Sequence, residues 1–501
     1  MTYRLATSFF ALSAALAAPV MADVNASDVW SNQQALYGSM GATLSGDLSG
    51  EQLSNPEINV ILPEGIASFQ IKTDAVTLTE NSDGSVTIEY PSPTTVTVAG
   101  GAEGEGSFSA TATMTHDGYT VTATGNPGDI TYVSAATNLR LEIDDVSVDG
   151  AADLEKMAIE GFMTLTNWGG TSQVTEGNLI TYTAEAEVGT TEADITFDVE
   201  NISAHSTQIT MPITTAIEAS FPVGGSDVMN LSAALRDGLS LVMRSTGEGN
   251  SSTTKTTLDG EAFNTQKTST GAQEFELSFT EEGLALNGEA SSFAMTMFDP
   301  LIFPSEIQFG IGALSMDYDV PLNASDEPQD FRIATGLKDV TIGESIWGMI
   351  DPAGQLPRDP AEISFDITGM GTNGIDLLNF AALAGLMGPP PIEVDEVTIE
   401  NLRIAAVGAE ATAKGAMTFD WTDFQTIPGI ARPEGAVTVN LNGANALMDR
   451  LVAMGLIPEE DLMMPRMMMG MFATPVGDDM LETVLEVNDQ GHVLANGQRL
   501  Q

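Results

Sequence analysis

The side chains that most often bind metals are scarce and scattered in this chain. The three histidines, His116, His205 and His492, lie far apart, and none has a second histidine or a carboxylate at the spacing of a metal site. Because a metal site needs several ligands together, we expect solvent-facing histidines on strands or turns. The absence of cysteine excludes disulfides, thiolate catalysis, iron–sulfur clusters and zinc–thiolate sites.

One stretch fits the sequence pattern of a serine nucleophile motif but lacks the other elements that this motif requires. Ser252-Thr253-Thr254-Lys255 fits the S-x-x-K pattern of serine β-lactamases, and Lys267-Thr268-Ser269 follows it. That chemistry needs a serine on a helix, an S-D-N element and a distant K-T-G strand. Here both matches lie close together in a segment rich in Ser and Thr, so we reject this assignment.

Asp145-Val146-Ser147-Val148-Asp149-Gly150 resembles the start of a calcium loop. It has oxygen-bearing side chains at positions 1, 3 and 5 and a glycine at position 6. The twelfth position is Lys156, where a calcium loop needs a bidentate glutamate. Asp-Gly is also a common strand turn, so we expect a turn here.

A dense group of methionines lies near the C-terminus. Its members are Met463, Met464, Met467, Met468, Met469 and Met471. Thioethers bind Cu(I), but methionine also fills irregular cores and adaptable apolar surfaces. No histidine or cysteine flanks the group, so packing in a core or on an apolar ligand surface is the favoured interpretation.

The charge balance is the strongest compositional signal. Seventy Asp and Glu residues face 17 Lys and Arg, for a formal net charge of -53. Such a surface repels nucleic acid and anionic lipid headgroups. So many carboxylates make any paired acids uninformative, and no G-x-S-x-G, P-loop, Rossmann or H-E-x-x-H motif is present. We therefore predict no enzyme and no cofactor, with a carboxylate-based hydrolase as the last alternative.

Residues 1–22 are expected to be a Sec-type signal peptide. Arg4 supplies the positive start, Leu5 to Ala18 a short apolar region, and Val20-Met21-Ala22 the cleavage site. The apolar run is too short for a membrane-spanning helix, and no later segment is long enough. We predict a mature chain that starts at Asp23, has no transmembrane helix and lies in the periplasm of a Gram-negative bacterium or is secreted.

Alternating apolar and polar residues dominate the mature chain. Ser85 to Tyr90, Asp194 to Val199, Phe275 to Phe279 and Ile363 to Ile367 each place apolar side chains on one face only. This pattern predicts half-buried antiparallel strands. Asp117-Gly118 and Glu282-Gly283 are typical turns, so we expect a hairpin around each. The predicted fold is mainly β, with large twisted antiparallel sheets in two related halves and a few short packed helices.

Short helices are expected at a few places. Ser27 is the predicted cap of a first helix, and further helices are expected at residues 375–387, 445–454 and 458–472. The first of these three is apolar nearly all round and should be buried on the sheet, and Pro465 should kink or end the last. We place the N-terminal β-rich half at 23–222 and the C-terminal half, which ends in a hairpin, at 223–501. Gly247 to Gly271 is either a loop or two exposed strands.

The organisation of the mature chain resembles a known family. The pattern consists of Asp28-Val29-Trp30 in the first helix, Leu451 to Glu460, the strand Leu481 to Val487 and the ending Gly491 to Gln498. In these features the chain resembles the alphaproteobacterial secreted family catalogued as domain of unknown function 2125. Its C-terminal module is similar to other periplasmic β-rich proteins of unknown function. The resemblance implies no activity and no functional residue.

Together these features predict a non-enzymatic periplasmic binding or envelope-maintenance protein. A curved sheet with one apolar face and an incomplete cover would form a groove for a lipid, another apolar small molecule or an envelope protein. No catalytic, cofactor or metal residue is assigned, and the ligand-binding residues are unknown. The alternatives are an outer-membrane β-barrel, which the 6% aromatic content and the non-aromatic C-terminus disfavour, and an acidic extracellular structural or adhesive protein.

Overall fold

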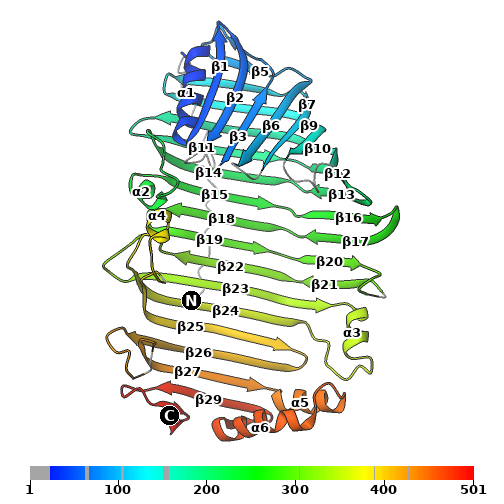
Figure 1. Ribbon diagram of the computed structural model, residues 1–501, viewed down its shortest axis with the longest axis vertical. Coiled ribbons are helices and arrows are strands. Elements are labelled where there is room, and N and C mark those ends of the chain that lie inside the picture. The colour runs from blue at the N-terminus through cyan, green and yellow to red at the C-terminus, as the bar shows by residue number, and fades with distance from the viewer. Residues whose placement is uncertain are drawn as a thin grey trace.

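The computed structural model describes residues 23–61, 67–102, 106–149, 157–303, 305–388, 390–426 and 429–500. Within them the chain is mainly β, and its strands form one large antiparallel sheet that runs the length of the molecule (Figure 1). The predicted fold class is confirmed in this respect. The predicted signal peptide lies outside the described residues.

The N-terminal unit combines one helix with short strands. The elements are α1 (Ala26–Ser39), β1 (Ala42–Ser49), β2 (Gln52–Ile61), β3 (Ala67–Thr73), β4 (Val76–Glu80), β5 (Val86–Glu89), β6 (Thr94–Ala102), β7 (Gly106–Asp117) and β8 (Thr120–Asn126). Helix α1 begins after Asn25, not after Ser27 as predicted, because the Asn25 side chain and Asp28 form a reciprocal capping box. Val29 and Leu36 of α1 pack with Val86 and Ile130 in the best-buried core of the protein.

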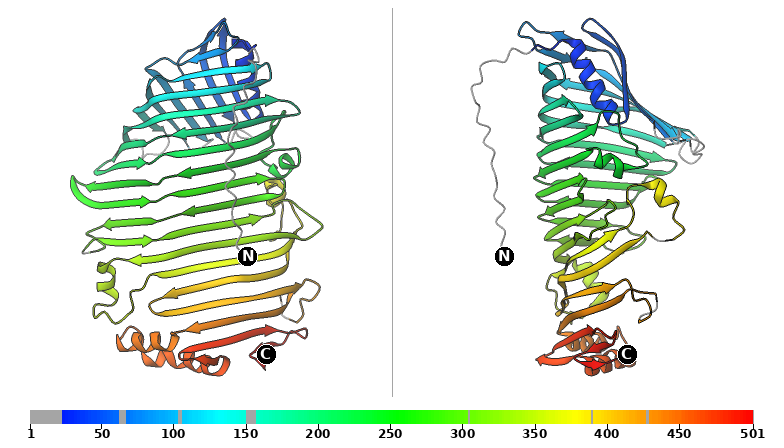
Figure 2. Two further views of the ribbon diagram at one scale, coloured as in Figure 1. Left: turned by 180° about the vertical axis from the view of Figure 1, so that it is seen from behind. Right: turned by 90° about the vertical axis from the view of Figure 1, so that its left-hand side faces the viewer.

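Two long strands join this unit to the rest of the sheet. They are β9 (Asp129–Asp149) and β10 (Met157–Glu176), which pair with each other. Strands β7 and β8 both pair with β9 instead of with each other, so the hairpin predicted around Asp117-Gly118 is wrong. The side view in Figure 2 shows the N-terminal strands and α1 leaning over one side of the upper sheet.

Below β10 the chain crosses the sheet repeatedly in rungs, each made of two consecutive strands. The pairs are β11 (Leu179–Val188) with β12 (Thr191–Val199), β13 (Ile202–Thr210) with β14 (Ile213–Pro222), β15 (Ser240–Gly247) with β16 (Asn250–Leu258), β17 (Glu261–Thr270) with β18 (Gln273–Thr280), β19 (Gly283–Ala290) with β20 (Phe293–Phe298), and β21 (Ile307–Ile311) with β22 (Ala313–Val320). The segment Gly247 to Gly271 is thus the second of its two predicted alternatives, a pair of strands.

The two strands of a rung are one path with a short break. Met211 N donates to Gly249 O at 2.9 Å and Glu248 N donates to Pro212 O at 3.1 Å, so hydrogen bonding continues across the break. Neighbouring rungs keep the same register on both sides: Ile213 faces Gly247, and Thr210 faces Asn250. Side-chain alternation therefore continues through the breaks, and each side of the sheet can be followed from rung to rung.

The sheet ends in long single strands and short terminal ones. They are β23 (Gln329–Ile342), β24 (Ala361–Asn373), β25 (Ile392–Ala406), β26 (Ala409–Asp420), β27 (Arg432–Asn442), β28 (Thr474–Gly477), β29 (Met480–Val487), β30 (Val493–Ala495) and β31 (Gln498–Arg499). Strands β14 and β15, on either side of the boundary predicted at residue 222, pair directly. The sheet therefore passes through that boundary, and a relationship between the two halves stays a prediction.

The remaining helices lie near the ends of rungs. They are α2 (Leu231–Arg236), α3 (Glu344–Ile350), α4 (Phe380–Ala384), α5 (Ala444–Ala453) and α6 (Glu459–Phe472). The buried helix predicted at residues 375–387 is wrong, because α4 spans only five residues and none of them is buried. Helix α6 continues through Pro465 instead of ending there. The apolar character of the 375–387 segment therefore gives the sheet no buried helical cover.

Candidate functional site: an open apolar side of the sheet

One side of the sheet carries a continuous set of apolar side chains. Following the register from β14 to β25 gives one unbroken row: Ile217, Met243, Leu277, Leu286, Tyr318, Ile333, Ile367 and Ile399. Neighbouring rows on the same side add Leu241, Phe279, Leu284, Phe275, Met316, Phe365 and Leu402. We call these fifteen residues the apolar face.

The apolar face is poorly covered. None of its residues is fully buried, and Ile333 is 39% exposed. In contrast, Val86 and Ile130 of the N-terminal core are 0% exposed. Single exposed apolar residues are ordinary on protein surfaces, but a contiguous row over many strands marks a surface that binds apolar partners or ligands.

The other side of the same strands is polar and carries ion pairs. Arg244 bridges Glu276 at 3.1 Å and Glu218 at 3.6 Å, on the strands to either side of it. Arg332 repeats the arrangement lower in the sheet, with Asp317 at 2.8 Å and Asp366 at 2.9 Å. Such exposed pairs add little stability each, but they identify this as the polar side of the sheet. The two sides therefore differ in chemistry along most of the sheet.

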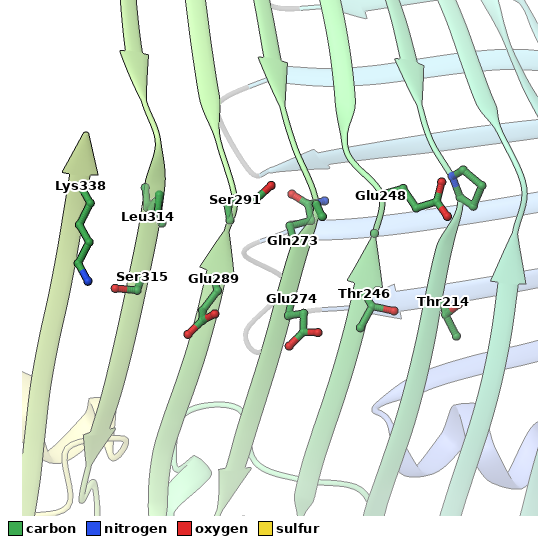
Figure 3. Close-up of a pocket in the computed structure, with 15 residues that line it drawn as sticks. Thr214, Thr246, Glu248, Gln273, Glu274, Glu289, Ser291, Leu314, Ser315 and Lys338 are labelled. Atoms are coloured by element: carbon green, nitrogen blue, oxygen red, sulfur yellow. The ribbon is translucent and has the colours of Figure 1, made fainter. Parts of the chain in front are cut away.

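A furrow of about 590 Å³ crosses the polar side at the rung breaks (Figure 3). Thr246, Glu274, Glu289 and Lys338 line it, each from a different strand. The glutamates are exposed, and no hydrogen bond joins two side chains of the furrow in the described part of the chain. Among these described residues no nucleophile–base pair is therefore assigned.

A second hollow, of about 460 Å³, lies on the apolar side. Phe275, Leu314 and Met316 line it around Gly288. Gly288 stands between Phe275 and Met316 in one row, and a Cβ placed there would come within 3.2 Å of Met316 Cγ. Gly288 is buried, so the Met316 side chain already covers the place that a Cβ would take, and the hollow lies beside that side chain.

A third cavity, of about 340 Å³, lies under α1 at the upper end of the same side. Val29 and Trp30 of α1 form part of its lining, with Tyr132 of β9 and Ser172 of β10. The register continues the central row of the apolar face upward through Ala184 to Ser172 and Tyr132. The cavity is therefore the covered end of the side that lies open below.

The residues considered as chemical sites in the sequence are not brought together. His205 Nε2 lies 2.8 Å from Asp194 Oδ1 on the neighbouring strand, and His116 Nε2 lies 3.0 Å from the Tyr90 carbonyl. Ser252 and Lys255 are three positions apart on one strand, so they point to opposite sides. No group of three or more His, Asp or Glu side chains in the described ranges is placed to hold a metal.

The segment that resembles the start of a calcium loop is a strand in the part that the structure describes. Asp145 and Ser147 lie on β9 and pair with Thr111 and Ser109 of β7. Residues 150–156, which complete the proposed loop, lie outside the described residues. The described part of the segment thus has the geometry of a sheet and not of a calcium loop.

The methionine cluster on α6 is a surface feature. Met463, Met464, Met467, Met468 and Met471 are each at least half exposed. The interpretation of this cluster as core packing is therefore wrong for these five side chains. An apolar binding surface and a thioether copper site both stay predictions.

The cavity under α1 was not among the features predicted from the sequence.

Comparison with known proteins adds no assignment. No protein-family model, curated protein or solved structure matches the chain. The resemblance to the secreted family of unknown function stays a prediction. None of the helices in the described ranges has the length and apolar character needed to cross a membrane.

Proposed function

We propose that this protein is a non-enzymatic binding protein of the bacterial periplasm that holds a lipid or another apolar molecule against the apolar face. The observation that carries this proposal is the unbroken row from Ile217 to Ile399, which lies open along the sheet. Covering such a row with hydrocarbon is favourable by roughly 25 cal/mol per Å² of apolar surface removed from water.

Two further features support a ligand on this side. The hollow lined by Phe275, Leu314 and Met316 gives depth to the middle of the face. The opposite side is covered by ion pairs of Arg244 and Arg332, so it keeps the complex in solution. The net charge of -53 favours an uncharged ligand over an anionic one. An envelope protein that delivers or receives the ligand stays a prediction.

The test is identification of the bound molecule together with a matched pair of variants. The mature chain is purified without detergent from a periplasm, extracted with organic solvent, and the extract analysed by mass spectrometry. Leu286→Glu places a charge on the apolar face, and Ala285→Glu places the same charge one residue away on the polar side.

We expect an apolar molecule in stoichiometric amount from the wild type and from Ala285→Glu, and much less from Leu286→Glu. A folded wild-type protein that yields an empty extract and gains no thermal stability from added lipids would overturn the proposal. Equal amounts of ligand from both variants would show that the molecule binds elsewhere.

A further inference from the structure

The cavity under α1 has an unusual lining. Besides aliphatic side chains it contains Trp30 and Tyr37 of α1 and Tyr90, Tyr119 and Tyr132 from three other regions of the chain. The whole chain has only seven tyrosines against 20 phenylalanines, and four of the seven line this one cavity. A core that needed only apolar rings would be filled by phenylalanine at no polar cost.

One of these hydroxyls has a structural partner. Tyr132 Oη donates to Asn32 Oδ1 at 2.8 Å, and Asn32 Nδ2 donates to Glu176 Oε1 at 2.8 Å. These two hydrogen bonds connect β9 and β10 to α1 and give the Tyr132 hydroxyl a partner within the protein. The Tyr132 hydroxyl therefore has a structural role.

The other three hydroxyls are not satisfied in this way. Tyr37, Tyr90 and Tyr119 have no hydrogen bond from their hydroxyls to any residue in the described ranges. The rings of Tyr90 and Tyr119 lie 5.4 Å apart. Burial raises the pKa of Tyr90 well above its usual value, and repulsion from ionised Tyr119 and Tyr37 raises it further. Burial raises the pKa of Tyr37 and Tyr119 as well, so all three hydroxyls remain neutral donors on residues that line the same cavity.

The surroundings also restrict the charge of a ligand. Glu57 is part of the lining, but its carboxylate bonds Gln70 and Lys72 on the other face of the strands, opposite the cavity-lining side chain of Ile58. No other acidic or basic residue lines the cavity in the described part of the chain. A charged head would therefore lose its hydration in the cavity with no opposite charge to replace it. Neutral phenol donors instead suit an uncharged oxygen acceptor, such as an ester or carbonyl group.

We propose that the cavity under α1 binds the oxygen-bearing head of an uncharged amphiphile, whose hydrocarbon chain extends along the apolar face. The hydroxyls of Tyr37, Tyr90 and Tyr119 donate hydrogen bonds to the head, and the aromatic rings enclose it. The volume of about 340 Å³ is at the small end of ligand cavities, which fits a head and not a whole lipid. The position of the hydrocarbon chain rests on the proposed function, whereas the choice of head depends on the cavity alone.

The test compares probes that share a dodecyl-length chain. Calorimetric titrations use glycerol monolaurate, which is uncharged and carries an ester, dodecyl phosphate and dodecyltrimethylammonium, each below its micelle concentration. The triple variant Tyr37→Phe, Tyr90→Phe and Tyr119→Phe keeps the rings and removes the hydroxyls. Thr246→Val is the matched control, because it removes a hydroxyl from the polar side of the sheet, outside both the cavity and the apolar face.

Glycerol monolaurate should bind best to the wild type and to Thr246→Val. The triple variant should bind it about tenfold or more weakly, since a net hydrogen bond corresponds to a factor of a few up to about ten. Binding should change the fluorescence of the protein, and Trp30→Phe should remove that change. Unchanged affinity in the triple variant, or a preference for dodecyltrimethylammonium, would overturn the assignment of the hydroxyls.

A second probe separates this inference from the proposed function. N-phenylnaphthylamine has no oxygen acceptor and reports on apolar surface. One outcome is that Leu286→Glu loses binding of this probe, while the triple variant keeps its binding of both the probe and monolaurate. That outcome would refute the head site and leave the proposed function standing. Binding that is insensitive to Leu286→Glu, with a monolaurate effect in the triple variant, would refute the apolar-face function and leave the head site.

Discussion

The openness of the apolar face can be measured by comparing two isoleucines. Ile130 is 0% exposed in the N-terminal core, and Ile333 is 39% exposed on the apolar face. Ile→Ala in a tight core costs about 2–5 kcal/mol, because it removes buried methyl groups and leaves a cavity. At Ile333 about three carbons are lost from a site that is only partly buried and can admit water, so the cost should be about 1.5 kcal/mol. Both positions are on strands, so the loss of β preference is common to both.

Ile130→Ala should therefore destabilise the ligand-free protein by about 2 kcal/mol more than Ile333→Ala. The measurement is urea unfolding of solvent-extracted protein, followed by circular dichroism and tryptophan fluorescence. Added ligand should increase the cost of Ile333→Ala and leave that of Ile130→Ala unchanged. Equal costs in the ligand-free protein would refute the reasoning, since they would mean that the apolar face is already buried in solution, for example by a second copy of the chain.

Three further predictions follow from particular features. Gly249→Ala should destabilise the protein by about 2 kcal/mol or more in urea unfolding, because Gly249 has a φ of +123° and an added Cβ would collide with the Thr270 carbonyl oxygen. Gly260→Ala, at a turn with open space around the added Cβ, should cost less. Burial raises the pKa of Tyr90 and Tyr132 above the ordinary value of 10.0, so the unfolded chain loses these protons at a lower pH than the folded protein. The free energy of unfolding should therefore fall as pH rises above about 10, by up to ~1.4 kcal/mol per pH unit for each tyrosine. Urea unfolding at several alkaline pH values should show a shallower decline in Tyr90→Phe than in the wild type. The melting temperature should rise from low to high salt because screening relieves the repulsion behind the net charge of -53, and a flat or falling melting temperature would contradict this.

Local alternation predicted individual strands and their apolar faces well. Phe275 to Phe279 and Ile363 to Ile367 lie on β18 and β24, with their apolar residues on the predicted common side. The turn at Glu282-Gly283 does join two paired strands. These successes depend on neighbouring residues only, because a two-residue period and a tight turn are both set within a few positions of the chain.

Predictions that needed distant partners were less reliable. The Asp117-Gly118 turn has the same local pattern, yet β7 and β8 lie end to end along one edge of β9 instead of pairing with each other. The apolar segment at residues 375–387 contains only the short exposed helix α4, because the strands on either side of it pair with each other directly. An apolar segment signals burial only if the fold brings another apolar surface to it.

The cavity under α1 could not be found in the sequence. Its tyrosines are spread from Tyr37 to Tyr132 with no common spacing. Pairing of β5 with β8 and of β8 with β9 brings their strands together, and α1 closes the space from above. The only available signal was the concentration of scarce tyrosines in the first part of the chain, and this becomes informative only once the register is known.

The sequence by itself determined the class of the fold, the acidity of the surface and the absence of cysteine chemistry, because composition and local alternation do not depend on which strands become neighbours. The tertiary structure alone decided that the apolar sides of successive strands line up into one open face, that its upper end is closed by α1, and that five methionines of α6 lie on the surface. The physical reason is that register and cover are set by hydrogen bonding and packing between segments far apart in the chain, which a one-residue shift in pairing would reverse.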